Sequence, residues 1–172
     1  MRKESNLLMK YIRLAILEIA VVVLLLLLDL IVKHLTEINI NGNERITIIN
    51  GFVALTFTKN TGAAFSLLSD SFHFLVIVRL IMSVIMLGIL IIFHRKLTAL
   101  LRVSMCLILA GAVGNLIDQM RFGYVRDMFE FLFVKFAVFN IADICIVIGV
   151  IALMLEMLLN KRLLSEKKTN TE

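Results

Sequence analysis

The sequence predicts a mainly α-helical membrane protein with four transmembrane helices, a small extracytoplasmic β unit and a short extracytoplasmic interfacial segment. Of its 172 residues, 60% are hydrophobic and only 18% are charged, whereas soluble domains average about 45–50% apolar residues. The apolar residues gather in four long runs, and a helix needs about 20 such residues to cross a bilayer. The chain has no proline, which favours uninterrupted helices because proline frees backbone groups that lipid cannot satisfy.

The four expected spans cover about residues 14–32, 72–93, 97–117 and 136–159. We treat residues 1–172 as a single membrane domain, because no low-complexity linker or internal repeat divides them. Basic residues cluster before the first span, between the second and third spans, and after the fourth: Arg2, Lys3, Lys10 and Arg13; Arg95, Lys96 and Arg102; Lys161, Arg162, Lys167 and Lys168. By the positive-inside rule, these segments and both termini face the cytoplasm. The net charge of +5 is therefore explained by the basic residues of the cytoplasmic segments, and we expect no nucleic-acid partner.

Two segments, about residues 33–71 and 118–135, are then extracytoplasmic. In the first, Ile46–Ile49 and Phe52–Thr58 are rich in strand-forming residues and flank Asn50-Gly51, a dipeptide that tolerates positive φ in a tight hairpin. The second segment mixes charges with aromatic residues, which is typical of a chain that lies at the membrane interface. The sequence therefore predicts a β-hairpin followed, later in the chain, by an interfacial segment.

Carboxylates and amides lie beside two of the most apolar runs. Asn115 and Asp118 are three residues apart at the outer end of the third span, and Asn140 and Asp143 repeat this spacing at the fourth. A helix places residues three apart on one face, and polar groups near lipid are costly and rarely incidental. With Asp127 between them, these residues are expected to converge on one polar pocket at the outer membrane boundary.

Asp127 and Asp143 are the expected catalytic pair. Two neighbouring carboxylates cannot both ionise easily, so they share a proton; one can then activate water while the other polarises a carbonyl. The pattern indicates neither a cofactor nor a metal site. A small proton-coupled transporter that uses the same two aspartates is an alternative. Asp29 and Lys33, four residues apart, are on spacing alone an ordinary helix ion pair.

Five short motifs occur in a fixed order along most of the chain: Asp29-Leu-Ile-Val-Lys33, Asn60-Thr-Gly-Ala-Ala-Phe65, Gly114-Asn115-Leu-Ile-Asp118, Gly123-Tyr-Val-Arg-Asp127 and Phe139-Asn140-Ile-Ala-Asp143. Together they resemble the motifs of lipoprotein signal peptidase, the type II bacterial signal peptidase. The resemblance implies an intramembrane aspartyl endopeptidase that removes the signal peptide of a diacylglyceryl-modified prolipoprotein just before the lipidated cysteine. It also implies an active site at the extracytoplasmic face of the bacterial cytoplasmic membrane.

The same resemblance makes Asp127 and Asp143 the catalytic dyad. It assigns substrate binding or dyad support to the other polar residues at the motif positions, which are Asn60, Asn115, Asn140, Asp29, Lys33, Asp118 and Gln119. The expected partners are lipid-modified prolipoproteins and membrane lipids, and we expect the chain to act as a monomer without a cofactor.

Gln119 departs from the family pattern, in which arginine usually follows Gly-Asn-x-x-Asp. Glutamine cannot reproduce the charge and the fixed donors of a guanidinium. The sequence offers Arg126 and Arg121 as replacement cations and predicts that Gln119→Arg is tolerated. The departure also motivates a second alternative, a catalytically weak relative that still binds lipidated substrate.

Overall fold

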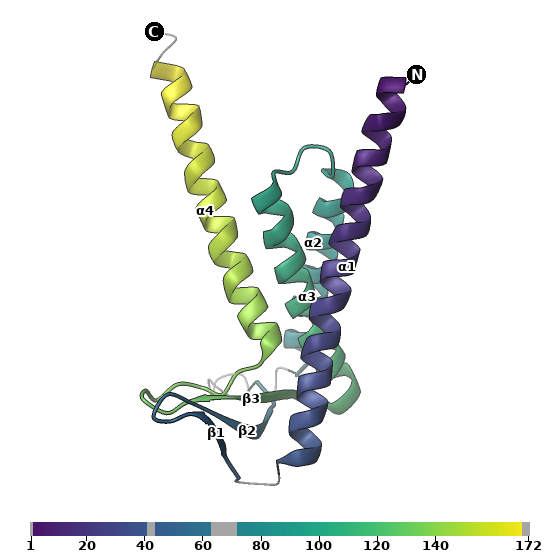
Figure 1. Ribbon diagram of the computed structural model, residues 1–172. Coiled ribbons are helices and arrows are strands. Elements are labelled where there is room, and N and C mark those ends of the chain that lie inside the picture. The colour runs from purple at the N-terminus through teal and green to yellow at the C-terminus, as the bar shows by residue number, and fades with distance from the viewer. Residues whose placement is uncertain (1, 41–43, 63–71, 170–172) are drawn as a thin grey trace.

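The computed structural model describes residues 2–40, 44–62 and 72–169. These residues form four helices and one three-stranded sheet (Figure 1): α1 (Arg2–Asn39), β1 (Ile46–Ile49), β2 (Val53–Asn60), α2 (Phe72–Ile92), α3 (Ala99–Phe122), β3 (Val125–Phe131) and α4 (Ile141–Thr169). All four helices are long and apolar enough to cross a membrane. The predicted fold class, a four-span helical protein with a small β unit, is therefore confirmed.

The first and last helices extend well beyond the apolar runs that predicted them. The 38 residues of α1 rise about 57 Å, whereas the hydrocarbon core is about 30 Å thick. The start of α1 and the end of α4 lie at the same end of the molecule, and the sheet lies at the opposite end (Figure 1). At the sheet end, α3 continues to Phe122 and stops at Gly123, whose φ of 80° suits a left-handed cap.

Helix α3 is the most buried of the four and packs against α1, α2 and α4. Its contact with α4 depends on glycine. A Cβ atom on Gly111 would overlap the backbone carbonyl oxygen of Ala142, and one on Gly149 would crowd Ile108 and the carbonyl of Ser104. The two helices therefore approach more closely than larger side chains would permit, which sets the position of the first turn of α4 against α3.

Gly111→Ala is expected to destabilise the protein by about 1–3 kcal/mol, because the added methyl group must push α4 away from α3. Gly88→Ala in α2 is the matched control, since a Cβ there meets no atom within 4 Å. Alanine favours a helix over glycine by about 1 kcal/mol, so the control should be neutral or slightly stabilising. Thermal unfolding of both variants in detergent measures the difference, and equal melting temperatures would contradict the close-contact account.

The sheet has the order β1-β2-β3, and both pairings are antiparallel. The hairpin at Asn50-Gly51 is confirmed, with Gly51 at a φ of 71°. In the second predicted extracytoplasmic segment, residues 118–122 complete α3 and residues 125–131 form the third strand, which was not predicted. The backbone N–H and C=O groups of β2 on the side away from β1 need hydrogen-bond partners. Strand β3 provides them, with Thr58 opposite Asp127 and Asn60 opposite Val125.

Candidate functional site

Apart from Asn140, which directly precedes α4, the predicted site residues belong to the strands β2 and β3 and to the parts of α1, α3 and α4 that adjoin the sheet in Figure 1. Hydrogen bonds and ion pairs join eight of the nine into one network: Asp29, Lys33, Asn60, Asn115, Asp118, Asp127, Asn140 and Asp143. The ninth, Gln119, is buried next to Asp118 on α3. Residues 63–65 of the Asn60 motif lie outside the described residues. Five elements, α1, β2, α3, β3 and α4, therefore contribute to one polar site.

Asn140 is the junction of this network. It lies one residue before α4, so it caps the helix and does not belong to it. Its Oδ1 accepts from the backbone N–H of Asp143 at 2.9 Å, and Asp143 Oδ2 accepts from the backbone N–H of Asn140 at 3.1 Å. This reciprocal arrangement is a capping box. It replaces the shared helix face expected for the two residues, because the chain must leave β3 before the helix can begin.

The side-chain amide of Asn140 also reaches the other aspartate. Its Nδ2 donates to Asp127 Oδ1 at 2.6 Å and to Asn115 Oδ1 at 3.1 Å. The neighbouring Phe139 pairs with Phe129 of β3 through two backbone hydrogen bonds of 2.8 and 3.0 Å. The cap of α4 is therefore fixed to the strand that carries Asp127, and one asparagine holds both aspartates.

Each aspartate also accepts a hydrogen bond from a second asparagine. Asn60 Nδ2 donates to Asp127 Oδ2 at 2.8 Å, and Asn115 Nδ2 donates to Asp143 Oδ1 at 2.7 Å. The amide of Asn60 is itself oriented, since its Oδ1 accepts from the backbone N–H of Gly62 at 2.8 Å. The asparagines thus fix the orientation of both carboxylates without adding charge.

Burial raises the pKa of Asp127 to about 6, because an apolar environment disfavours the charged form. The hydrogen bond from Asn60 opposes this rise, whereas the negative charge of Asp143 adds to it. The bond from Asn140 and the charge of Lys33 also favour the ionised form. Asp127 is therefore a carboxyl group that can hold or release a proton close to neutral pH.

Lys33 links the dyad region to α1. Its side chain is fully buried, and its Nζ lies 2.7 Å from Asp29 Oδ2, 3.3 Å from Asp118 Oδ2 and 3.1 Å from Asn115 Oδ1. Asp29 Oδ1 in turn accepts from the backbone N–H of Ala142 at 2.9 Å, at the start of α4. The i,i+4 pair predicted from the spacing is present, but it is a buried tie between α1, α3 and α4, unlike an ordinary surface pair.

Of the two cations offered as replacements for an arginine at position 119, Arg126 joins the network through Asp118. Arg126 donates to Asp118 Oδ1 at 2.7 Å and to Glu37 Oε2 at 2.9 Å, and the guanidinium of Arg121 lies 5.1 Å from the centre of the Phe122 ring. The sequence analysis missed Glu37, although its i,i+4 spacing from Lys33 was a usable signal.

The cation that contacts Gln119 comes from α2. Arg79 donates from Nη1 to Gln119 Oε1, a contact that the sequence analysis also missed. The signal was a single arginine within an otherwise apolar helix, a position that is costly in lipid and often functional.

Cavities lined by described residues adjoin both aspartates. One of about 430 Å³ is lined by Asn60 and Asp143 together with apolar side chains that include Phe136, Phe139 and Val147. A smaller one of about 190 Å³ is lined by Asp127, by the end of β2 at Asn60, and by Ala137 and Val138. Asp143 therefore faces an apolar groove, and Asp127 faces a smaller recess with both polar and apolar walls.

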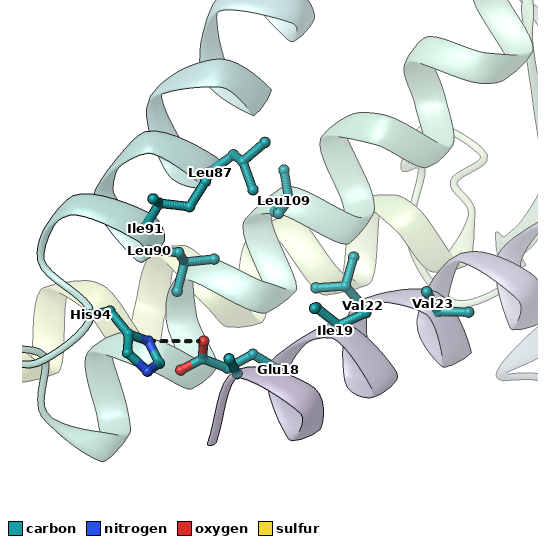
Figure 2. A pocket seen from close by; sticks show the side chains of 10 residues that line it. Glu18, Ile19, Val22, Val23, Leu87, Leu90, Ile91, His94 and Leu109 are labelled. Carbon is teal, nitrogen blue, oxygen red and sulfur yellow. Dashed lines mark ion pairs between the residues drawn. The ribbon is translucent and has the colours of Figure 1, made fainter. Parts of the chain in front are cut away.

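Another cavity, of about 470 Å³, lies between α1, α2 and α3 toward the end of the bundle opposite the sheet. Figure 2 shows Glu18 and His94 paired at one edge, at 3.5 Å, with apolar residues such as Leu90 and Val22 along the walls. Glu18 also accepts from Arg102 at 2.5 Å. Glu18 is the single carboxylate among the described lining residues, so this cavity offers no paired acids.

Comparison with known proteins identifies the family of the chain. The sequence model of the family described as Signal peptidase (SPase) II matches residues 21–159. The lipoprotein signal peptidase of Enterococcus faecalis is 38% identical over 159 residues, covering 92% of this chain and 98% of that relative. That of Moorella thermoacetica is 40% identical over 139 residues, covering 79% of this chain and 89% of the relative.

Solved structures give the same result. A bacterial membrane enzyme determined by the in meso method at 2.3 Å resolution matches with a TM-score of 0.75 and 28% identity, covering 84% of this chain and 88% of the other. A second such structure, at 1.9 Å resolution, matches with a TM-score of 0.74 and 28% identity, covering 82% and 92%. Sequence and fold agree over nearly the whole length, and the chain belongs to the signal peptidase II family.

Proposed function

We propose that the protein is an aspartyl endopeptidase that cleaves the signal peptide from diacylglyceryl-modified prolipoproteins just before the lipidated cysteine. The observation that carries the proposal is the pair of carboxylates, Asp127 and Asp143, held from two different elements by Asn140. The names of the similar proteins, which are lipoprotein signal peptidases, support this substrate class.

In this proposal Asp127 carries the shared proton, because its pKa is raised to about 6, and Asp143 is the base. Asp143 removes a proton from a water molecule whose oxygen attacks the scissile carbonyl, while Asp127 donates its proton to the carbonyl oxygen. The tetrahedral intermediate then collapses, the amide nitrogen takes a proton from the dyad, and the C–N bond breaks. The net reaction adds one water across the peptide bond.

The groove of about 430 Å³ beside Asp143 is suited to the apolar part of such a substrate. Val147 and Ile148 on its α4 wall are more than half exposed, so in a membrane this face meets acyl chains. A substrate anchored by its own signal helix and lipid is already confined to the bilayer, and the dyad gains from that proximity. Asn60 lines both cavities at the dyad and is our main candidate for contact with the substrate backbone.

The proposed location is the bacterial cytoplasmic membrane, with both termini in the cytoplasm, the dyad at the extracytoplasmic face and the chain acting as a monomer. Basic residues cluster in the first part of α1, between α2 and the first turn of α3, and late in α4, which supports this orientation by the positive-inside rule. The sheet lies at the opposite end of the bundle (Figure 1), and it carries Asp127 on β3, with Asp143 in the first turn of α4.

A proton pathway fits the structure less well than a peptidase. Charged residues occupy two depths, the dyad region near the sheet and the group of Glu18, His94 and Arg102 near the other end. Between them, α2 and α3 pack through an apolar cluster that includes Met86, Leu90, Met105, Cys106, Ile108 and Leu109. A relay of protons would need ionisable groups or water through this depth.

Cleavage of a lipidated precursor by the purified full-length chain in liposomes tests the proposal. We expect the diacylglyceryl-modified precursor to be cleaved at least about 100-fold more efficiently than the unmodified one, because two acyl chains concentrate the substrate at the membrane. Equal turnover of the two precursors would contradict the substrate class. Tight binding of the lipidated precursor without cleavage would instead establish the catalytically weak alternative.

A further inference from the structure

Arg79 is a cation in an apolar helix, and its guanidinium contacts Gln119, the residue that follows Asp118 on α3. The other residues of α2 are apolar apart from His73 near its start and Ser83, so an arginine here costs free energy unless it has a polar partner. That partner is the side-chain oxygen of Gln119, which is buried on α3. The contact holds the guanidinium between α2 and α3 at the outer end of the bundle.

The guanidinium interacts electrostatically with the carboxylates of Asp143, Asp127 and Asp118. Asp118 is already paired with Lys33 and Arg126. Among the residues that the structure describes, none forms a direct ion pair with Arg79. The positive charge therefore lies near the dyad without being neutralised by a carboxylate in contact with it.

Gln119 is well suited to hold such a charge. Its amide oxygen accepts a hydrogen bond from the guanidinium, as a carboxylate would, but it adds no negative charge. A guanidinium carries five N–H groups in a fixed fork, and the bond to Gln119 is made by one nitrogen, Nη1. The remaining donors can serve a second acceptor near the dyad, such as a carbonyl oxygen of a bound peptide.

We propose that Arg79 is the cation of the peptidase site, positioned by Gln119 so that it stabilises the ionised member of the dyad and donates hydrogen bonds to a backbone carbonyl of the substrate beside the scissile bond. This inference rests on the proposed peptidase function. Arg79 would contact the substrate, whereas Gln119 acts through Arg79 and is a positioning residue.

With Arg79 as the cation of the site, Gln119→Arg is expected to impair the enzyme. The sequence alone predicted that this variant would be tolerated, but the structure places position 119 against Arg79. In Gln119→Arg, two guanidinium groups would face each other and repel. Arg79 would also lose the amide oxygen of Gln119 that accepts its hydrogen bond. The single variant should therefore lower activity, whereas the exchanged pair Arg79→Gln with Gln119→Arg keeps one cation and one amide in the same contact.

A change in the charge of Arg79 should also alter the pH dependence of the dyad. The charged and titratable groups that surround the site are Asp127 and Arg126 on β3, Asp143 on α4, Asp118 on α3, and Asp29 and Lys33 on α1. Loss of a nearby positive charge favours the protonated form of a carboxyl. The pH–rate profile of Arg79→Gln should therefore move to higher pH, a change that a purely structural role would not produce.

The test compares wild type, Arg79→Gln, Arg79→Lys, Gln119→Arg and the exchanged pair in kinetics on a lipidated precursor. Arg79→Gln should lower kcat/KM by about 10- to 100-fold, the effect of losing one charge-assisted hydrogen bond, with KM raised and the profile moved to higher pH. Arg79→Lys should keep the position of the pH–rate profile but lose affinity, because lysine retains the charge without the fork. The exchanged pair should recover most of the loss.

Arg45→Gln is the matched control. Arg45 is 59% exposed and pairs with Glu130 on the sheet, so its loss removes a cation from the same end of the molecule but leaves the dyad untouched. Cleavage by wild type and by Asp127→Asn is measured first. If wild type does not cleave, or if Asp127→Asn cleaves as well as wild type, the peptidase function itself is rejected. If wild type cleaves, unchanged kinetics and pH profile in Arg79→Gln, or an exchanged pair less active than either single variant, would overturn the role of Arg79.

Discussion

Asp127→Asn and Asp143→Asn should each lower kcat for cleavage of a lipidated precursor by about 10⁴-fold or more, the scale expected when an essential acid or base is removed. The amide keeps the shape of the carboxyl group but cannot exchange its proton. Each change also replaces a carboxylate that accepts a hydrogen bond from Asn140 with an amide, in which the nitrogen donates and only the oxygen accepts. Single-turnover cleavage in detergent or liposomes measures the loss.

Glu130→Gln is the control for these two substitutions. Glu130 lies on β3 three residues after Asp127, and it pairs with the exposed Arg45 at 2.8 Å. The same carboxylate-to-amide change on the same strand should leave kcat within about threefold, because the partner of Glu130 is Arg45, a 59% exposed residue outside the dyad network. Full activity in either dyad variant, with melting temperatures like that of wild type, would rule out the aspartyl mechanism.

Lys33→Met should have the largest effect on stability. It removes the cation that lies within 3.3 Å of both Asp29 and Asp118 and leaves their buried charges partly uncompensated. Breaking a buried ion pair in this way costs about 3–5 kcal/mol. We expect a corresponding loss in the free energy of unfolding, measured in mixed micelles with increasing denaturing detergent, together with loss of cleavage.

Lys10→Met on the same helix is the control, because Lys10 is exposed and its change should be nearly neutral.

A second variant distinguishes the cost of leaving a buried carboxylate without its cation from the cost of lost packing at position 33. Removing the Asp29 charge as well, in Lys33→Met with Asp29→Asn, should recover part of the stability. Equal unfolding free energies for Lys33→Met and Lys10→Met would show that the buried network does not hold the helices together.

The spans, the hairpin and the identity of the polar residues follow from the sequence because they depend on local patterns. Burial of the Asp29–Lys33 pair cannot be predicted from local patterns, because it depends on how α3 and α4 pack around α1. The third strand was missed for a similar reason: residues 125–131 become a strand only by pairing with β2, far away in the chain. Strand pairing of this kind leaves little trace in composition.

Two features of the site show what sequence signals were available. Asn140-Ile-Ala-Asp143 before an apolar run resembles a capping box, so the position of Asn140 as the helix cap was predictable from spacing. The contact between Arg79 and Gln119 was not predictable, because it joins two helices across 40 residues. Only the cost of an arginine in lipid indicated that Arg79 needed a partner.

The account depends most directly on Asp127 and Asp143 acting as one proton-sharing pair. The decisive measurement is a titration of the Asp127 carboxyl group, followed by ¹³C NMR of the labelled full-length protein in micelles. We predict a pKa of about 6 in wild type and a lower pKa in Asp143→Asn, because removing a negative charge makes ionisation of Asp127 easier. A pKa near the ordinary 3.8 that is the same in both proteins would contradict the account.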